Sequence, residues 1–322
     1  MRIAFALLAT SLLAASPFAR AQADFPSKPI RLVVGFAAGG ISDVLGRAIA
    51  AKLAANIGQN VLVENKPGAG TTIAADFTAK AAPDGYTLFL QDITSHAINA
   101  SLYPKLPYDS VRDFTTVALV ASTPLMLVVH PSTPVKSARE LAAMLKASPG
   151  KYAYGSSGNG TILHLASELF ATTQGLSVTH VPYKGSAPAT QAIMANEVSF
   201  VFSTMPPAIS AVKGGKLRAL AVTTPARVGT TPEVPTMAEA GMPGVEIVLF
   251  SGILGPKGMD SGVVKKLNAE FAKVVASAEV RKIFDTLGAD PIATSSEEFG
   301  AMLGREIAKL APMVKASGAK VD

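Results

Sequence analysis

Residues 30–43 read IRLVVGFAAGGISD, which combines an apolar run, a glycine-containing loop and the start of a helix. The run from Ile30 to Gly35 has the composition of a buried strand, and the loop from Phe36 to Gly40 is short. Parallel sheets are built from units of strand, loop and helix in this order. The stretch therefore predicts an α/β fold.

The helix that should follow this loop is indicated by Leu45, Ile49 and Leu53, which recur at every fourth residue and so share one face. Gly58 stands where a helix C-terminal cap is expected, and Val61 opens the next apolar run. Further β-rich runs alternate with helical patterns along the chain. We therefore expect the unit to be repeated.

The loop of this first unit has the chemistry of an anion site. Backbone N–H groups in the first turn of a helix lack partners within the helix and lie at the positive end of its dipole. Glycines let a ligand approach such groups closely, and Ser42 or Asp43 could cap the helix. Gly39 and Gly40 could equally serve only to make a turn.

Residues 152–161 read YAYGSSGNGT and repeat the order of strand, glycine loop and helix start. Ligands of parallel α/β sheets bind beyond the carboxyl ends of the strands, so two such loops, one in each half of the chain, could hold one anion between them. Residues 181–188 give a third candidate, in which Pro188 suits a first helical turn. There Tyr183 and Lys184 could approach the ligand or merely pack and be solvated.

These patterns divide the chain into two lobes. Successive strand candidates at 117–120 and 125–129 place the first crossing between lobes at Ser122 to Pro124. Serine and glutamate at capping-box spacing mark helix starts at Ser137 and Ser295. The predicted divisions are 1–23 for an export signal, 24–122 for the first part of lobe 1, 123–224 for lobe 2, and 225–322 for a connecting loop and a return to lobe 1 with C-terminal helices.

The first 23 residues predict an export signal. Arg2 supplies one positive charge, residues 3–19 are uncharged, and small residues suit cleavage after Ala21 or Ala23. Serine and proline interrupt the uncharged stretch, unlike the roughly 20 strongly apolar residues of a membrane anchor. We therefore expect a mature protein in the periplasm that is not embedded in the membrane.

Composition excludes several classes of protein. The 29 Lys and Arg against 23 Asp and Glu give a net charge of +6, and no basic run exceeds the pair Lys265–Lys266, which argues against a nucleic-acid partner. The chain has no cysteine, which excludes disulfides and cysteine nucleophiles. The histidines lack metal-ligand spacing, and His164 is expected to pack or cap. We expect no metal and no cofactor.

Enzyme motifs are incomplete, so we expect no catalytic residues. A nucleophile elbow centred on Ser157 would need glycine at the position of Asn159. The phosphate loop is absent, and residues 35–40 do not spell the dinucleotide fingerprint G-x-G-x-x-G. Residues 155–160 match a glycine-rich nucleotide turn only loosely, which leaves a nucleotide-binding enzyme as an alternative.

Distinctive motifs occur along nearly the whole chain after the signal. They are FPSKPI at 25–30, VENKPGAG at 63–70, PDGYTL at 83–88, LPYD at 106–109, GSSGNGT at 155–161, HVPYKG at 180–185, LRALAV at 217–222 and VPT at 234–236. In these motifs the chain resembles the Bug-type receptors of tripartite tricarboxylate transporters, a family of extracytoplasmic solute-binding proteins.

The resemblance implies a type II periplasmic-binding-protein fold, in which two α/β lobes joined by crossing segments hold a carboxylate between two glycine-rich loops, partly through ordered water. It implies that backbone amides and hydroxyls of both loops contact the ligand, that Phe36 packs against the ligand body, and that Asp43 orients the loop or a polar ligand group. The candidate ligand-binding residues are Phe36, Ala38, Gly39, Gly40, Ser42, Asp43, Ser156, Gly158, Gly160, Thr161, Tyr183 and Ser203.

Some positions depart from the family's pattern. Many members carry an acidic residue where this chain has Ser203, and a tryptophan that is common near residues 250–252 is missing, because the chain has none. Ser203 cannot pair with a cationic amine as a carboxylate could. The departure therefore favours a less polar or non-amino ligand.

The resemblance also implies partners. It predicts a receptor that captures a small organic carboxylate by hinge closure and delivers it to a tripartite tricarboxylate-type membrane permease. A sensor that presents the same bound state to a signalling partner is an alternative use of the cleft.

Overall fold

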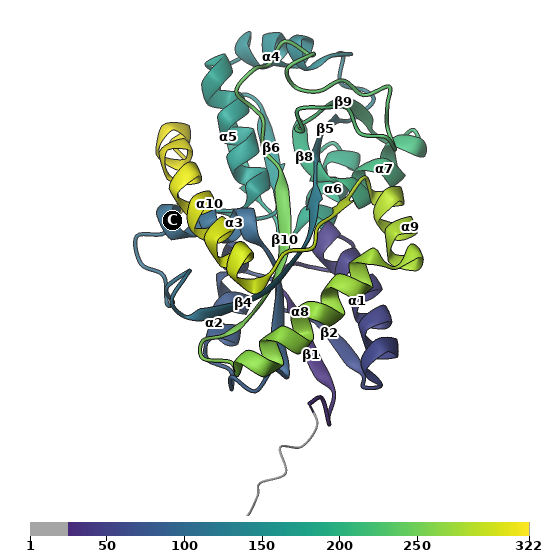
Figure 1. Cartoon of the computed structure of the whole chain (residues 1–322). Coiled ribbons are helices and arrows are strands. Elements are labelled where there is room, and N and C mark those ends of the chain that lie inside the picture. The colour runs from purple at the N-terminus through teal and green to yellow at the C-terminus, as the bar shows by residue number, and fades with distance from the viewer. Residues whose placement is uncertain (1–24, 322) are drawn as a thin grey trace, which may run out of the picture.

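The computed structural model describes residues 25–321 as two lobes, each built on its own β-sheet (Figure 1). The export signal predicted for residues 1–23 lies outside the described residues. Both lobes are mixed α/β structures, and together they form the type II periplasmic-binding-protein fold that the sequence predicts.

The first lobe contains a six-stranded sheet. In spatial order its strands are β11 (Asp290–Pro291), β4 (Phe114–Thr123), β10 (Leu249–Pro256), β3 (Thr87–Asp92), β1 (Ile30–Val34) and β2 (Val61–Asn65). β1 pairs in parallel with β2 and β3, while β10 runs antiparallel between β3 and β4. The accompanying helices are α1 (Ile41–Ile57), η1 (Ala69–Thr71), α2 (Thr72–Ala79), α3 (Ile93–Leu102), α8 (Ser261–Ala276), α9 (Ala278–Leu287) and α10 (Ser296–Ser317).

The unit β1–α1 forms as the sequence predicts. Every residue of β1 except Arg31 is buried between neighbouring strands, which explains its continuous apolar run. Leu45, Ile49 and Leu53 are buried on α1. Gly58 ends this helix in the left-handed region at φ 67°, where a residue with a side chain would be strained.

The second lobe contains a five-stranded sheet. In spatial order its strands are β7 (Thr179–Pro182), β6 (Ala153–Ser156), β8 (Phe200–Thr204), β5 (Leu125–Val129) and β9 (Arg218–Val222). β6 pairs in parallel with β7 and β8, and β5 lies antiparallel to β8 and β9. Its helices are α4 (Ala138–Lys146), α5 (Ile162–Gln174), α6 (Ser186–Met194) and α7 (Met205–Lys213).

Two segments connect the sheets. β4 ends at Thr123 in the first sheet and β5 begins at Leu125 in the second, so only Pro124 separates them. The return runs from β9 to β10 through residues 223–248, which contain no helix and only one isolated bridge, between Val222 and Thr236. The abundance of Thr, Pro and Gly in this return explains its irregular path.

β10 is a long strand that the sequence pattern does not indicate. It contains Gly252, Gly255 and Pro256, and such residues weaken the signal of a strand. The structure shows why glycine is needed in this strand. A Cβ atom at Gly252 would lie 2.5 Å from the ring of Phe299, so the close packing of α10 on the sheet excludes any side chain there.

The C-terminal helices cover the first lobe and reach the second. α10 packs against α3 and β4 of the first lobe and against α5 of the second (Figure 1). Ser295 and Glu298 form a complete capping box at its start, as predicted. At α4, Ser137 accepts from the N–H of Glu140 as predicted, but the Glu140 carboxylate accepts from the backbone of Lys136.

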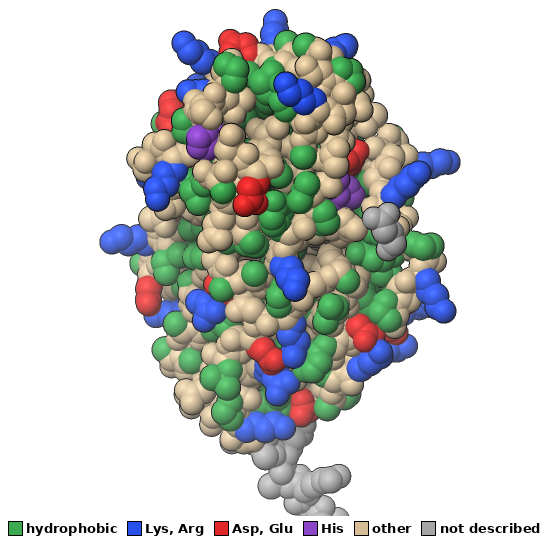
Figure 2. All heavy atoms as spheres, turned by 180° about the vertical axis from the view of Figure 1, so that it is seen from behind, with side chains coloured by type: hydrophobic (Ala, Val, Ile, Leu, Met, Phe, Trp, Pro, Cys, Tyr) green, Lys and Arg blue, Asp and Glu red, His purple; other side chains and the backbone are tan. Residues whose placement is uncertain are grey.

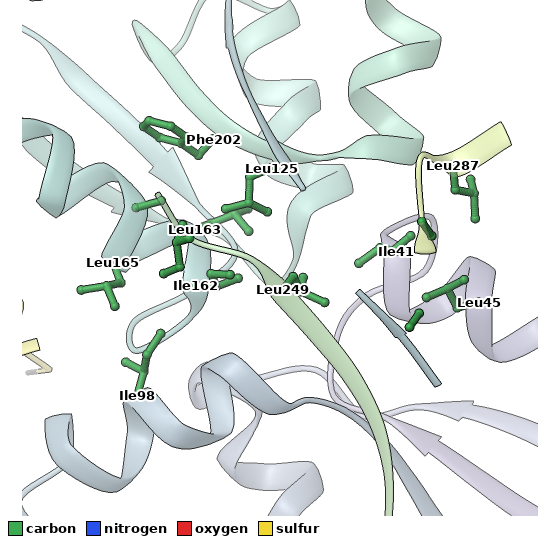
Figure 3. Close-up of a cluster of buried hydrophobic side chains, with 14 of the residues drawn as sticks. Ile41, Leu45, Ile98, Leu125, Ile162, Leu163, Leu165, Phe202, Leu249 and Leu287 are labelled. Carbon is green, nitrogen blue, oxygen red and sulfur yellow. The ribbon is translucent and has the colours of Figure 1, made fainter. Parts of the chain in front are cut away.

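One apolar core extends from the first lobe into the second. It includes Ile41 and Leu45 of α1, Leu163 of α5 and Phe202 of β8. Leu249 of β10 lies between the Ile41 and Leu163 side chains (Figure 3). The lobes therefore meet through apolar packing as well as through the connecting segments.

The outer surface carries charges of both signs. On the face that Figure 2 shows, Lys and Arg side chains are spread among acidic and neutral ones and form no continuous basic field. Across residues 25–321, no helix is both long and apolar enough to cross a bilayer.

Candidate ligand-binding site

A small pocket lies between the lobes, and we call it the inner pocket. The first lobe contributes residues from the β1–α1 loop, the end of β3 and the start of β10, and the second contributes residues near the starts of α5, α6 and α7. Its lining residues are Phe36, Gly40, Ile41, Ser42, Asp92, Ser157, Leu163, Ser186, Thr204 and Leu249. The space open to the centre of a water molecule is about 10 Å³.

The first glycine loop divides into a part that faces this pocket and a part that does not. Phe36, Gly40 and Ser42, which are three of the predicted ligand-binding residues, line it. Ala38 and Gly39 are exposed and lie outside its lining. Ala38 and Gly39, which are also predicted to bind the ligand, therefore do not face the inner pocket in this arrangement.

Asp43 holds the first loop in shape, as the family resemblance implies. Its Oδ2 accepts from the N–H of Gly39 at 3.0 Å, and its Oδ1 accepts from Arg47 at 2.8 Å and from Asn65 at 3.1 Å. Asn65 also donates to the carbonyl of Phe36. Burial opposes ionisation of Asp43, but these hydrogen bonds outweigh it and lower its pKa. The Gly39 amide is thus already used within the loop.

The second glycine loop is stabilised mainly by its own side chains. The N–H of Gly158 donates to Ser156 Oγ at 3.1 Å, and the N–H of Gly160 donates to His164 Nδ1 at 3.2 Å. Thr161 Oγ1 donates to the carbonyl of Gly158 at 2.7 Å. Ser157 is the residue of this loop that lines the inner pocket. Its hydroxyl is buried and has no partner among residues 25–321.

The remaining two predicted residues lie apart from the inner pocket. Tyr183 lines a second cavity and its hydroxyl is 3.5 Å from Glu197. Ser203 is fully buried, and its hydroxyl lies 2.7 Å from Thr190 Oγ1 and 3.2 Å from Ser186 Oγ. Since Ser203 is absent from the pocket lining, its size and charge do not by themselves decide which ligand fits.

The second cavity, which we call the outer pocket, is larger and offers about 300 Å³ to water. It is lined by Gly35, Gly68, Ala69, Gly70, Thr71, Tyr103, Ser157, Gly158, Asn159, Pro182, Tyr183, Lys184 and Val321. Ser157 lines both cavities, so it marks the boundary between them.

Close backbone contacts across the outer pocket join the lobes. A Cβ atom at Gly70 would lie 2.0 Å from the carbonyl oxygen of Asn159, and Gly70 has φ 58°, so glycine is required there. Tyr103 Oη donates to the carbonyls of Ala69 at 3.1 Å and Asn159 at 3.3 Å. The second glycine loop therefore faces the 68–71 turn, whereas the first glycine loop faces residues 184–186.

Helix starts converge on the inner pocket. Gly40 precedes α1, Leu163 lies in the first turn of α5, Ser186 begins α6 and Thr204 precedes α7, and all four residues line the cavity. In this described part of the chain, none of these four helices is capped by the side chain of its N-cap residue. Because a helix start carries partial positive charge and unpaired N–H groups, the pocket favours a negatively charged group.

One of these starts is instead capped from the other lobe. The N–H of Ile162, the first residue of α5, donates to Ser95 Oγ at 2.9 Å. Ser95 Oγ in turn donates to Asp92 Oδ2, in a short contact. Asp92, Ser95 and Ile162 therefore form a hydrogen-bonded bridge between α3 and α5.

A group of aromatic and titratable side chains lies behind the second glycine loop. The rings of His164 and His180 stack with centroids 4.0 Å apart, and Ser156 Oγ lies 2.6 Å from His180 Nε2. Burial and repulsion by His180 lower the pKa of His164 to about 3. His164 therefore packs and caps, as predicted. No group of acidic or histidine side chains within the described chain could hold a metal ion.

Several residues that line the inner pocket were not predicted from the sequence. Asp92 stands at the carboxyl end of β3, beside β1, so the rule that ligands bind beyond the ends of parallel strands could have identified it. Ser157 lies in the second glycine loop, whose motif already predicts a ligand site. Ser186 lies within the third candidate, residues 181–188, and Thr204 ends β8, which runs parallel to β6, so both had a signal of the same kind. Leu249 had none, because its approach to the pocket depends on how the lobes meet.

Two α/β lobes that enclose a small pocket are the architecture of solute-binding proteins. Residues 45–319 match the family model described as "Tripartite tricarboxylate transporter family receptor". This match covers most of the chain. The chain belongs to this family, whose Bug-type members it resembles in sequence and structure.

Individual relatives agree with this assignment. The chain is 36% identical to "Protein BugT" of Bordetella pertussis over 298 residues, which is 92% of this chain and 91% of the relative. A structure of Rpa4515 of R. palustris with adipate matches with a TM-score of 0.89 and 35% identity, covering 92% of this chain and 100% of that one. The periplasmic binding protein BugD matches with a TM-score of 0.88 and 30% identity, covering 92% and 99%.

Proposed function

We propose that this chain is a periplasmic receptor that captures a small organic carboxylate in the inner pocket and delivers it to a tripartite tricarboxylate-type membrane permease. The observation that carries the proposal is the convergence of uncapped helix starts on a cavity that both lobes line. The structure of a related protein with adipate supports a carboxylate as the ligand.

The expected binding strength fits a transport receptor. A hydrogen bond to a charged group contributes about 1.5 to 3 kcal/mol, and micromolar affinity needs about 8 kcal/mol. The amides at the start of α1 and the hydroxyls of Ser42 and Ser157 are enough donors to reach this range. An arginine is not required, and none lines the inner pocket in the described chain.

Ligand entry requires the lobes to separate. The inner pocket has about 10 Å³ open to the centre of a water molecule, which is room for roughly one water. Rotation about the connections at Pro124 and within residues 223–248 would open it, in the manner of a hinge. The bond from the Ala37 N–H to the Lys184 carbonyl, 2.9 Å long, would break on opening.

The same site does not suit catalysis. Ser156 and His180 form a close Ser–His pair, but Ser156 is fully buried and lines neither described cavity. A substrate in the inner pocket would meet Ser157 instead, whose hydroxyl has no base within hydrogen-bond distance in residues 25–321. We therefore propose binding without chemical conversion.

Isothermal titration of the purified mature protein tests the receptor proposal. The ligands are carboxylates of two to six carbons, their neutral amides as matched controls, and ATP. We expect at least one carboxylate to bind at micromolar concentration or below, and its amide to bind at least 30-fold more weakly. Binding of ATP without any carboxylate would contradict the proposal and favour a nucleotide-binding enzyme.

A further inference from the structure

Asp92 places a carboxyl group inside the inner pocket. It is 1% exposed, it ends β3, and it precedes the first residue of α3. Its Oδ1 accepts from the N–H of Ser95 at 3.0 Å, and its Oδ2 accepts from the hydroxyl of Ser95. Burial outweighs these bonds and raises the pKa of Asp92 to about 6. The group therefore carries a negative charge at neutral pH in a site with little water.

No cationic side chain in the described chain pairs with Asp92, which faces only the partial positive charge at the start of α3. The other residues that line the inner pocket, from both lobes and from every element around it, are neutral and do not titrate in the ordinary pH range: Phe36, Gly40, Ile41, Ser42, Ser157, Leu163, Ser186, Thr204 and Leu249. Buried charges are normally paired. An unbalanced carboxylate in a binding pocket thus requires a separate explanation.

Two hydroxyl groups of the opposite lobe lack partners in the same cavity. Ser157 Oγ and Thr204 Oγ1 are buried and make no hydrogen bond within residues 25–321, and both residues line the inner pocket. Buried polar groups are almost always satisfied, so these hydroxyls indicate a polar guest. A hydroxyl can donate to a carboxylate and also accept from an amine.

The helix starts and Asp92 give the inner pocket two opposed chemical preferences. The uncapped starts of α1, α6 and α7 favour a negative group, whereas α3 already has its N–H groups satisfied by an acidic cap. A guest with a carboxylate at both ends would place one of them near Asp92, and like charges at close range cost several kcal/mol.

We propose that Asp92 selects, among small carboxylates, those whose second polar group donates hydrogen bonds, with an ammonium group favoured over a hydroxyl and a second carboxylate disfavoured. This inference rests on the proposed receptor function. It reverses the preference for a non-amino ligand that Ser203 suggested, because Asp92 supplies in the pocket the carboxylate that position 203 lacks.

A matched series of ligands tests the selection by isothermal titration at pH 7.5. The chain length, counted without the second group, runs from two to six carbons, and the second group is ammonium, hydroxyl, carboxylate or methyl. At four carbons the ligands are 4-aminobutanoate, 4-hydroxybutanoate, glutarate and pentanoate. We expect the best amino acid of the series to bind at least 10-fold more tightly than the dicarboxylate of equal length. In Asp92→Asn this preference should fall below threefold.

The variant keeps the shape of the pocket, because asparagine is also a good N-cap residue. Asp260→Asn is the matched control, since Asp260 caps α8 by accepting from Gly262 and Val263 and is absent from the inner pocket. It should retain the preference of the natural protein. A thermal melt of each variant checks that it is folded.

Acidification gives a second readout. Protonation of Asp92 removes the charge that pairs with the ammonium, so affinity for the amino ligand should fall at least fivefold from pH 7.5 to pH 5 in the natural protein. It should change less than twofold in Asp92→Asn.

Three results overturn the inference. A dicarboxylate that binds at least as tightly as the amino acid of equal length contradicts it, and so does a preference that survives Asp92→Asn. If no carboxylate of any kind binds, the receptor proposal itself fails. Binding of carboxylates without selection by Asp92 leaves the receptor proposal standing and removes only this inference.

Discussion

The helices of this protein fall into two groups, those that begin with a side-chain cap and those that do not. The two groups lie in different parts of the molecule. Away from the inner and outer pockets, α4, α8, α9 and α10 are each capped by a side chain, from Ser137, Asp260, Ser277 and Ser295 respectively. At the inner pocket, α1, α5, α6 and α7 lack such a cap on their N-cap residue, as does α2 beside the outer pocket. α3 is the exception at the inner pocket, because Asp92 caps it.

This difference distinguishes helix starts that contribute to stability from helix starts that are available to bind a ligand. A side-chain cap contributes about 1 kcal/mol to stability, and the four helices that begin away from the pockets each have one. At the starts of α1, α6 and α7 these contributions are missing, and the N–H groups that a cap would satisfy are left for a ligand. Proteins commonly give up stability at functional sites in this way. Changes at the pocket should therefore alter binding most, and changes at the outer caps should alter stability alone.

The largest effect should come from giving α1 an acidic cap. In Gly40→Asp the new carboxylate would occupy the helix start and repel an anionic ligand, and we expect affinity for the best carboxylate to fall at least 100-fold, since like charges cost several kcal/mol. Gly40→Asn has nearly the same size without the charge and should retain much more affinity. Titration calorimetry measures both, and equal losses would show that charge is not the cause.

A control for this change exists on an outer helix. Gly304 is an exposed glycine of α10, and a Cβ atom added to it would have no neighbouring heavy atom within 4 Å. Gly304→Asp should leave the affinity for the carboxylate unchanged within twofold.

The next largest effect should be the change in unfolding free energy caused by Asp92→Asn. A pKa raised from 3.8 to about 6 in the folded state means that ionisation of this carboxyl opposes folding. The cost is complete above pH 6, at about 3 kcal/mol, and it disappears as the pH falls below about 4. Asp92→Asn should therefore raise the unfolding free energy by up to about 3 kcal/mol at pH 7.5 and by much less at pH 4.

Urea denaturation at the two pH values measures this difference. Asp260→Asn, at a cap outside the pocket, should not stabilise the protein at either pH. A destabilised Asp92→Asn at pH 7.5 would contradict the claim that the buried charge is unbalanced.

A smaller effect should follow from Ser157→Ala. The unpartnered hydroxyl of Ser157 is expected to donate to the ligand, and a hydrogen bond to a charged group contributes about 1.5 to 3 kcal/mol, so affinity should fall roughly 10- to 100-fold. Stability should not decrease, because the free protein loses no hydrogen bond. Ser210→Ala on the exposed surface of α7 is the control. Unchanged affinity in Ser157→Ala would place the ligand elsewhere.

The smallest effect should come from an outer cap. Ser295→Ala removes the capping box of α10 and should lower the unfolding free energy by about 1 kcal/mol. Carboxylate affinity, measured by the same titration, should stay within twofold, because Ser295 does not line the inner pocket. An affinity loss as large as that of Ser157→Ala would erase the distinction between the two groups of helices.

Local sequence patterns predicted a helix or strand well where the residues of that element alone determine its structure. β1 and the buried face of α1 follow from an apolar run and a four-residue spacing, and the capping box at Ser295 and Glu298 follows from two residues. β10 escaped prediction because Gly252 is fitted to the ring of Phe299, a contact between segments far apart in the sequence.

The candidate site was predictable only in part, for a similar reason. Phe36, Gly40 and Ser42 lie where the first loop and its helix place them. The second loop uses the amides of Gly158 and Gly160 for its own bonds, which depend on side-chain positions that a motif does not specify. Which loops face each other depends on how the two lobes meet, and no local pattern encodes that.

A crystal structure of the protein with the tightest-binding carboxylate of the titration series tests the central claim most directly. We predict that a carboxylate oxygen lies within hydrogen-bond distance of the N–H groups at the start of α1, near Ile41 and Ser42, with Ser157 Oγ as a further donor. A carboxylate bound instead among Tyr103, Tyr183 and Lys184 in the outer pocket, with no contact to a helix start, would contradict the account.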